Sequence, residues 1–273
     1  MVAGALERKN VFRFLSEILP ESKFKEHLKS VLYEGKWKLL LKNWESIDGR
    51  LILEFENGLK LVSNVYRRED LLGMLHEIFV GNVYTRFHPL ETGDTVVDVG
   101  ANIGVFTILA AKSVGETGRV IAIEPERKNL KDLRNNLKIN GLKNVSVVPK
   151  GLWNRREKKK LYLKADARAH TLVGKSSLGD AEEIEVDTLD NILEELGVTR
   201  VDFIKMDIEG AEIQALEGME RTLKENDVRL VIAAYHEVDV KPTWKTIVPW
   251  LKQMGFRVRV RGEGYVYADK HRT

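Results

Sequence analysis

The sequence predicts an α/β protein with a doubly wound, mostly parallel sheet that an antiparallel hairpin closes. From residue 95 onward, short β-branched runs alternate with amphipathic segments, as expected for strands joined by helices. Residues 95–104, TVVDVGANIG, have the pattern of a strand, a glycine turn and the start of a helix. The chain ends in FRVRV, RGEG and YVYA, which predicts a final hairpin and one reversed strand in the sheet.

Composition limits the class of protein. A chain of 273 residues suffices for one large α/β domain or for a core with an appendage. It has no cysteine, which excludes disulfides, thiolate metal sites and a cysteine nucleophile. The first ten residues lack the apolar run of a signal peptide, and no apolar stretch approaches membrane-spanning length. We therefore expect a soluble cytoplasmic protein, with a Lys- and Glu-rich composition typical of thermophiles.

Residues 1–82 are predicted to form a helical and hairpin appendage. Apolar positions at helical spacing predict two short helices in residues 8–33, separated at Pro20. The alternating segment RLILEFENGLKLVS predicts a hairpin with a type I′ turn at Asn57 and Gly58. Residues 69–80 are predicted to be helical. Because no Ser/Gly/Pro-rich linker follows, we expect the appendage to pack against the core formed by residues 83–273.

The core elements follow in order. The first strand and its helix extend to about residue 111; after them we expect a strand at 119–125, a helix at 128–140 and a third strand within 144–154. An antiparallel pair at 159–165 and 182–189 is predicted as an insertion before a helix at 189–196. A fourth strand within 201–210, one helix at 211–226, a fifth strand at 228–237 and a helix at 244–254 then lead to the closing hairpin.

The glycine turn indicates which ligand the sheet holds. Gly100 and Gly104 do not form the dinucleotide fingerprint G-x-G-x-x-G, and Asp98 would repel a pyrophosphate at the end of the strand. S-adenosylmethionine carries an ammonium, a carboxylate and a sulfonium instead. Asp98 suits the ammonium, and the amides at the helix start suit the carboxylate. Glu124 ends the next strand and is placed to accept both ribose hydroxyls; the alternative is a structural turn in another kind of α/β protein.

Two segments carry a family resemblance. Residues 96–142, from VVDVGANIG to KINGL, followed by VDFIKMDIEGAEIQALEG, resemble the FkbM family of S-adenosylmethionine-dependent methyltransferases. The resemblance extends from about Tyr84 to the C-terminus. It implies a Rossmann-like class I methyltransferase fold for residues 83–273 and, most often, O-methylation of sugars or small metabolites. The predicted cofactor site comprises Tyr84, Asp98, Gly100, Ala101, Asn102, Gly104, Phe106, Glu124, Pro125, Lys150, Gly151 and Asp207.

The candidate catalytic residues end the fourth and fifth strands. Asp207 and Glu209 could accept a proton from the methyl acceptor, or they could simply cap the following helix. Tyr235 could stack on a planar acceptor, and His236 could accept a proton near neutral pH or be a hydrogen-bonded structural histidine. Lys205 shares a strand face with Asp207 and could be a buried salt-bridge partner or touch the substrate; the first role is favoured. Carboxylates with one histidine also suit a divalent metal, but the spacing is not diagnostic and no metal ligand is predicted.

Basic residues are concentrated in two segments. The net charge of +3 hides fourteen Lys and Arg against three Asp and Glu in residues 127–168, and six against two in residues 252–273. Trp153 and Tyr162 interleave with the first group, a combination that suits a polyanion. Structured RNA is therefore the favoured acceptor, with a base amino group such as cytosine N4 as one target. The predicted RNA-binding residues are Arg155, Arg156, Lys158, Lys159 and Lys160.

Three alternatives to an RNA methyltransferase stay open. The acceptor could be a hydroxyl group of a sugar or small metabolite, as the family resemblance implies. The protein could bind RNA without catalysis, or the basic residues could form an ordinary solvated surface. The segment MDIEG also differs from the D/N-P-P-Y/F loop that follows the fourth strand in many enzymes that methylate base amino groups.

Overall fold

A computed structural model describes residues 41–47, 50–55, 58–64, 68–163, 171–173, 181–238 and 240–270. The two helices expected in residues 8–33 lie outside this part of the chain. Within it, no helix combines the length and the apolar character needed to cross a bilayer.

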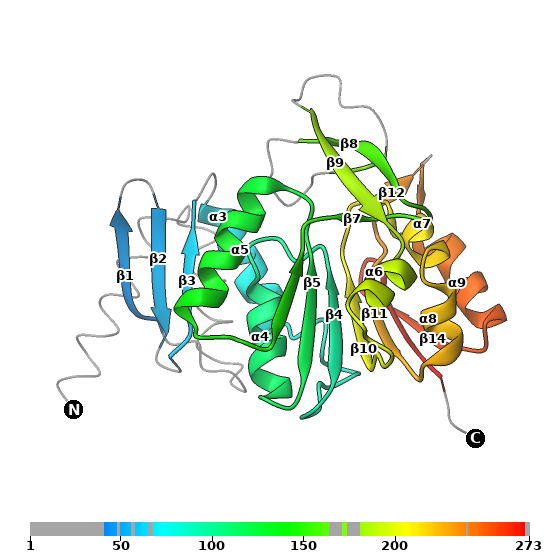
Figure 1. Cartoon of the computed structure of the whole chain (residues 1–273), viewed down its shortest axis with the longest axis horizontal. Coiled ribbons are helices and arrows are strands. Elements are labelled where there is room, and N and C mark those ends of the chain that lie inside the picture. Colours follow the sequence, from blue (N-terminus) through cyan, green and yellow to red (C-terminus); the bar gives the residue numbers. More distant parts are fainter. Residues whose placement is uncertain are drawn as a thin grey trace.

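The core is a seven-stranded sheet in the order β14-β15-β11-β10-β4-β5-β6 (Figure 1). Its five parallel strands at the centre and one edge are β4 (Thr95–Val99), β5 (Arg119–Ile123), β6 (Val145–Val148), β10 (Phe203–Met206) and β11 (Arg229–Ala233). The closing hairpin consists of β14 (Arg257–Arg261) and β15 (Tyr265–Asp269), and β15 pairs antiparallel with both β14 and β11. The predicted doubly wound sheet with one reversed strand is confirmed.

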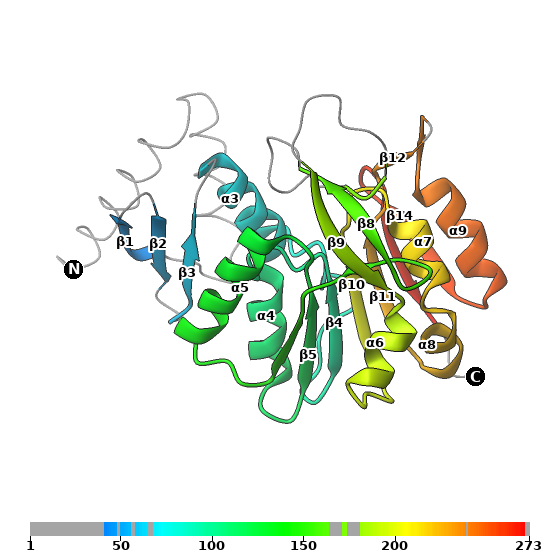
Figure 2. The ribbon, with the colours of Figure 1, turned by 45° about the horizontal axis from the view of Figure 1, so that its top comes forward.

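Helices cover both faces of this sheet (Figure 2). Along β4, Val96 packs into one hydrophobic core, whereas Val97 and Val99 pack into the other. This alternation is what a strand buried on both faces requires. The helices on the Val96 side are α4 (Val105–Val114) and α5 (Arg127–Ile139). Those on the other side are α6 (Leu189–Glu195), α7 (Glu212–Glu217), α8 (Glu220–Glu225) and α9 (Trp244–Gln253).

The single helix predicted over residues 211–226 is wrong, because α7 ends at Glu217 and α8 begins at Glu220. Gly218 lies at the break. A Cβ atom on Gly218 would lie 2.1 Å from the backbone oxygen of Trp153. The absence of a side chain therefore lets the helix pair approach the chain that leaves β7 (Gly151–Leu152).

The predicted insertion forms a separate three-stranded sheet. β8 (Glu157–Tyr162) pairs antiparallel with β9 (Ala181–Asp187), which confirms the predicted pair, and β9 also pairs in parallel with β7. Trp153, Leu161 and Val186 form a small core beneath this sheet. A further pair of two-residue strands, β12 (Glu237–Val238) and β13 (Lys241–Pro242), follows β11.

The described part of the appendage is an antiparallel sheet followed by a helix. Its strands are β1 (Leu41–Ile47), β2 (Arg50–Phe55) and β3 (Lys60–Ser63), and its helix α3 (Arg68–Leu75) continues into a π-helical turn η1 (His76–Val80). The β2–β3 hairpin is confirmed, although β1 was not predicted. Phe55 N donates to Leu59 O at 2.8 Å, so these two residues are paired at the end of the hairpin. Three residues lie between them in the sequence, whereas a type I′ turn has two.

The described part of the appendage contacts the core through the edge of β3. Asp132 and Asn136 on α5 and Asn140, its C-cap, stand four residues apart in the sequence. Their side-chain oxygens accept the backbone N–H groups of Asn64, Val62 and Lys60 at 2.9, 2.6 and 3.0 Å. Four residues of helix rise about 6.0 Å and two residues of strand about 6.6 Å, so the two rows of groups stay in register.

We expect Asn136→Ala to lower the free energy of unfolding by about 2–3 kcal/mol. The fully buried Asn136 side chain accepts from Val62 N and donates to the backbone oxygens of Val62 and Ile103 at 2.9 and 2.8 Å. Its removal leaves these backbone groups unpaired. Urea unfolding measures the change, with the half-buried neighbour Asn135 replaced by Ala as the control. Equal effects of the two substitutions would contradict this account of the docking.

Candidate active site

Two adjoining cavities lie where β4, β5 and β10 end. The first is lined by Glu124, Pro125 and Gly151 among others. The second lies between the start of α4 and the appendage. Both cavities are lined by Gly100, Asn102, Asp207 and Glu209.

The glycine turn is shaped by the close approach of two loops. Gly100 has a φ of 77°, and a Cβ atom there would lie 2.0 Å from Asp207 O. Only glycine therefore lets the loops after β4 and β10 meet. Gly104 has a φ of 91° and packs against Leu133. It precedes α4 without a side-chain cap, so the first amides of this helix are available to a ligand.

Glu124 lines the first cavity, and hydrogen bonds from the backbone hold both of its carboxylate oxygens in place. It is 5% exposed, and its Oε2 and Oε1 accept from the backbone N–H groups of Asn102 and Glu126 at 2.8 and 3.0 Å. Burial raises the pKa of Glu124 to about 7, although these two hydrogen bonds oppose the shift. Each oxygen has further acceptor capacity, so the carboxylate can receive two hydroxyl donors.

Asp98 lies away from both cavities. It is 0% exposed, its Oδ2 accepts from Thr107 Oγ1 at 2.6 Å, and its Oδ1 lies 3.1 Å from Lys205 Nζ. The parallel register places these two residues opposite each other on β4 and β10, so Lys205 is in a buried salt bridge, with Asp98 as its partner. Asp98 therefore neutralises Lys205 instead of reaching a ligand's ammonium, whereas Lys205 itself lines the second cavity.

A tyrosine connects the appendage to the end of β10. The buried Tyr84 hydroxyl lies 2.8 Å from Glu77 Oε1 and 2.9 Å from Asp207 Oδ2, and Tyr265 also donates to Glu77 Oε1 at 2.8 Å. Burial and the neighbouring carboxylates raise the pKa of Tyr84, so its hydroxyl remains a donor. Glu77 was not predicted. Its one signal in the sequence is an acid interrupting the apolar segment at residues 76–80.

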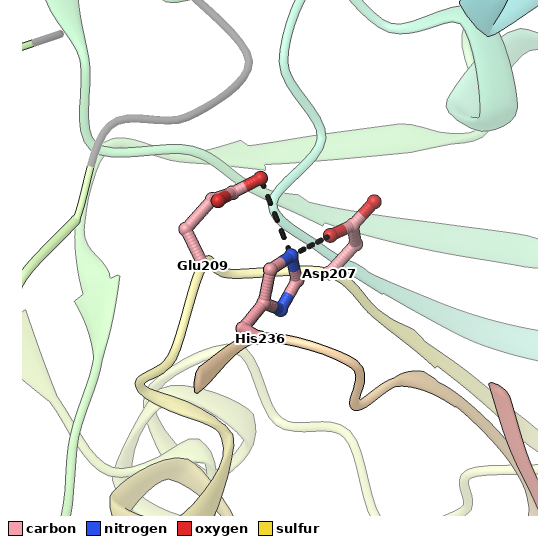
Figure 3. Close-up of side chains that lie close together, drawn as sticks. All are labelled: Asp207, Glu209 and His236. Carbon is pink, nitrogen blue, oxygen red and sulfur yellow. Dashed lines mark ion pairs between the residues drawn. The ribbon is translucent and has the colours of Figure 1, made fainter. Parts of the chain in front are cut away.

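The structure brings Asp207, Glu209 and His236 together, as Figure 3 shows. His236 Nε2 lies 3.3 Å from Glu209 Oε1 and 3.7 Å from Asp207 Oδ1. On the other edge of the ring, Nδ1 lies 2.9 Å from Oε1 of the fully buried Glu212. Sequence reasoning missed Glu212, whose signal is an acid in the first turn of a buried helix.

The electrostatics of this cluster assign different roles to its members. Burial lowers the pKa of His236, but the carboxylates of Glu209, Glu212 and Asp207 outweigh it and raise the pKa to about 10. The imidazole is then protonated near neutral pH, which disfavours the predicted role of proton acceptor. Burial raises the pKa of Asp207, against the lowering effect of Lys205 and His236. The predicted alternative of helix capping is not realised, since α7 has no side-chain cap.

The remaining predicted residues divide between the two cavities. Lys150 lines the first, but its Nζ is paired with Asp187 at 2.9 Å. Tyr235 lines the second, where its ring centroid lies 4.4 Å from that of His236 and 5.4 Å from that of Tyr265. The other predicted cofactor residues in the second lining are Tyr84, Ala101 and Phe106, whereas Gly104 lies outside both linings.

The basic residues of the inserted sheet are paired with acids. Arg156 lies 2.7 Å from Asp187, and Lys158 lies 2.9 Å from Glu183, both acids on β9. Within the same segment, Arg155 and Lys159 lie 3.0 and 3.7 Å from Glu157, and Lys159 also stacks over Trp153. Lys160 lies opposite Glu183 in the strand register. Four of the five residues predicted to bind RNA are therefore in ion pairs with acids, and the binding of RNA by this segment stays a prediction.

Comparisons with known proteins identify the family. The family model described as the methyltransferase FkbM domain matches residues 98–258. Methyltransferase sdnD of Sordaria araneosa is 25% identical over 213 residues, covering 67% of this chain and 80% of that protein. Methyltransferase 1 of Beauveria bassiana is 23% identical over 215 residues, covering 71% and 84% of the respective chains.

A solved structure supports the same fold. The crystal structure of methyltransferase FkbM from Methylobacillus flagellatus has a TM-score of 0.50 and 24% sequence identity. The match covers 67% of this chain and 45% of that one, so this chain spans less than half the length of its structural relative. Because the family model matches more than half of the chain, the protein belongs to the FkbM family of S-adenosylmethionine-dependent methyltransferases.

Proposed function

We propose that this enzyme transfers the methyl group of S-adenosylmethionine to a hydroxyl group of a small molecule. The observation that carries the proposal is that Asp207 and Glu209 line both cavities. A cofactor that extends from one cavity into the other brings its sulfonium past these two carboxylates. An acceptor in the second cavity then meets the methyl group and a proton acceptor at the same place.

The proposed position of the cofactor follows from the donors and acceptors of each cavity. The ribose hydroxyls donate to Glu124 in the first cavity, and the methionine end crosses Gly100 into the second. There, the carboxylate of the methionine lies near Lys205 and the uncapped amides of α4. Its ammonium lies near Glu77, which also lines this cavity. In this arrangement Asp98 acts indirectly, by holding Lys205.

The transfer is an in-line displacement. The acceptor oxygen attacks the methyl carbon while the carbon–sulfur bond breaks, and its electron pair stays on sulfur to give S-adenosylhomocysteine. The hydroxyl proton passes to the Asp207 carboxylate, whose raised pKa makes it a better proton acceptor than an exposed aspartate. The site therefore supplies orientation and one proton transfer, and no covalent intermediate is required.

Two observations favour a small acceptor over RNA. The second cavity is bordered by the appendage residues Met74, Glu77 and Ile78, so the acceptor enters a space bounded by side chains of both the appendage and the core. Arg156 and Lys158, two of the residues that phosphates would contact, are also in ion pairs with acids of β9. RNA remains the alternative that the test must be able to detect.

We expect the triple variant Arg155→Glu, Lys158→Glu and Lys160→Glu to methylate its acceptor within about threefold of the wild-type rate. Arg156 is left unchanged because it holds the buried Asp187. Labelled S-adenosylmethionine and fractionated cell extract identify the acceptor, and we expect the label in the small-molecule fraction. For an RNA acceptor, the slope of log affinity against log salt would fall by nearly one unit per lost contact. Label in RNA that the triple variant no longer produces would overturn the proposal.

A further inference from the structure

We propose that Asp207, Glu209 and His236 bind a divalent transition-metal cation in the wall shared by the two cavities. The binding site stands on its own geometry, whereas a role for the cation in catalysis rests on the proposed function. The three side chains come from the loops that follow β10 and β11, and Figure 3 shows them pointing toward a common centre.

The separations of the donor atoms fit a single cation. One donor atom from each of the three residues lies within 4.8 Å of the others. Ligands about 2.1 Å from a metal ion are roughly 3.0 Å apart at a right angle and about 4.2 Å apart when opposite. The distances from His236 Nε2 to Glu209 and Asp207, 3.3 and 3.7 Å, fall within this range. Two of the three separations therefore suit a single cation already, and the carboxylates of Asp207 and Glu209, which lie within 4.8 Å of each other, complete the set.

The orientation of His236 provides a second, independent observation. Its Nδ1 faces the buried carboxylate of Glu212 at 2.9 Å, so a hydrogen held on Nδ1 leaves Nε2 as the nitrogen that can exchange its proton for a cation, as in carboxylate–histidine–metal arrangements. The His236 side chain is only 10% exposed. Among the described residues, neither His236 Nε2 nor Asp207 Oδ1 has a hydrogen-bond partner. Without a metal, the protonated imidazole supplies the positive charge that faces these two carboxylates, and a bound cation would take the place of the proton on Nε2.

The set of donors indicates which cations fit. Two carboxylate oxygens and one imidazole nitrogen suit Mn²⁺, Fe²⁺ or Zn²⁺ better than Mg²⁺ or Ca²⁺, which prefer oxygen alone. Three protein ligands leave coordination positions open, as in catalytic sites. Because Asp207 and Glu209 line both cavities, these open positions face the acceptor. A hydroxyl bound there would have a lowered pKa, so it would lose its proton to solvent more readily, and its oxygen would then attack the methyl carbon as the carbon–sulfur bond breaks.

Mn²⁺ alone tests the site. Protein stripped with a chelator is titrated with Mn²⁺ by calorimetry, and we expect one saturable site. Electron spin-echo spectroscopy of the Mn²⁺-loaded wild type should show modulation by one imidazole nitrogen, a readout that needs no variant. If the wild type binds no Mn²⁺ saturably, or binds it without nitrogen modulation, the proposal is wrong and a proton on Nε2 is the occupant.

Variants assign the ligands. We expect His236→Ala and Glu209→Gln to weaken Mn²⁺ binding at least tenfold, and Glu212→Gln to weaken it by about tenfold through loss of ring orientation. Glu225→Gln, an exposed change on α8, should leave Mn²⁺ affinity unchanged. Affinity for S-adenosylhomocysteine shows that each variant is folded. If methylation resists the chelator but requires Asp207, the metal has no catalytic role and the proposed function stands. If the protein binds Mn²⁺ but methylates no acceptor, the metal site stands and the proposed function is wrong.

Discussion

Asp207→Asn is expected to lower the methylation rate by about a hundredfold or more while the melting temperature changes little. Asn keeps the shape of the side chain and can still accept from the Tyr84 hydroxyl, which lies 2.9 Å from Asp207 Oδ2. It loses the negative charge and the ability to take a proton from the acceptor. Single-turnover methylation with excess enzyme measures the chemical step.

The control for this variant is the cofactor. Glu77, Lys205 and the amides of α4 hold the methionine end in our proposal, so the affinity of Asp207→Asn for S-adenosylhomocysteine should change by less than tenfold. The exposed change Glu225→Gln serves as the matched loss of one carboxylate. Methylation by Asp207→Asn that stays within a few-fold of wild type would show that the carboxylate is structural.

Glu124→Gln is expected to weaken S-adenosylhomocysteine binding by tenfold to about a hundredfold. A carboxylate that accepts two ribose hydroxyls makes charge-assisted hydrogen bonds, each contributing about 1.5–3 kcal/mol. The amide keeps one acceptor oxygen but carries no charge, and it presents an N–H₂ group to one of the hydroxyls. Calorimetric titration at pH 8 measures the loss, and Glu116→Gln, an exposed change in the loop before β5, is the control.

The raised pKa of Glu124 also predicts how cofactor affinity depends on pH. Burial raises the pKa of Glu124 to about 7 in the free protein, and the hydroxyl donors favour the ionised form. Binding therefore lowers this pKa and releases a proton near pH 7, so affinity should rise by up to about tenfold per pH unit below pH 7 and level off above it. Calorimetry in two buffers with different ionisation enthalpies detects the proton. Proton release that persists in Glu124→Gln would contradict this assignment.

Long-range pairing explains the largest difference between the sequence-based expectation and the structure. The basic segment of residues 155–160 has a single acid within it, Glu157. Its other partners, among them Glu183 and Asp187, stand more than twenty residues later in the chain. Antiparallel pairing of β8 with β9 brings these charges together. A charge count along the sequence cannot detect a cross-strand partner. The RNA prediction therefore counted basic side chains of this segment without the acids that pair with them in the fold.

The sequence alone determined the features encoded by local pattern. Alternation of β-branched runs and amphipathic segments specified the order of strands and helices, and the closing hairpin specified the reversed strand. Gly100 and Glu124 could be placed because a glycine turn and a strand end have fixed positions relative to a parallel sheet. The residues Asp207, Glu209 and His236 could be brought near one another for the same reason, since parallel strands end at one edge.

Only the tertiary structure decided what depends on contacts between distant segments. The break between α7 and α8 follows from the approach of Gly218 to Trp153, and the pairing of Asp98 with Lys205 follows from the register of β4 and β10. Glu77 accepts a hydrogen bond at the site from Tyr265, 188 residues later in the chain, and Glu212 contacts His236 in the loop after β11. Whether a buried charge meets a ligand or a partner side chain depends on distances that no single segment encodes, and these distances decide the chemistry of the site.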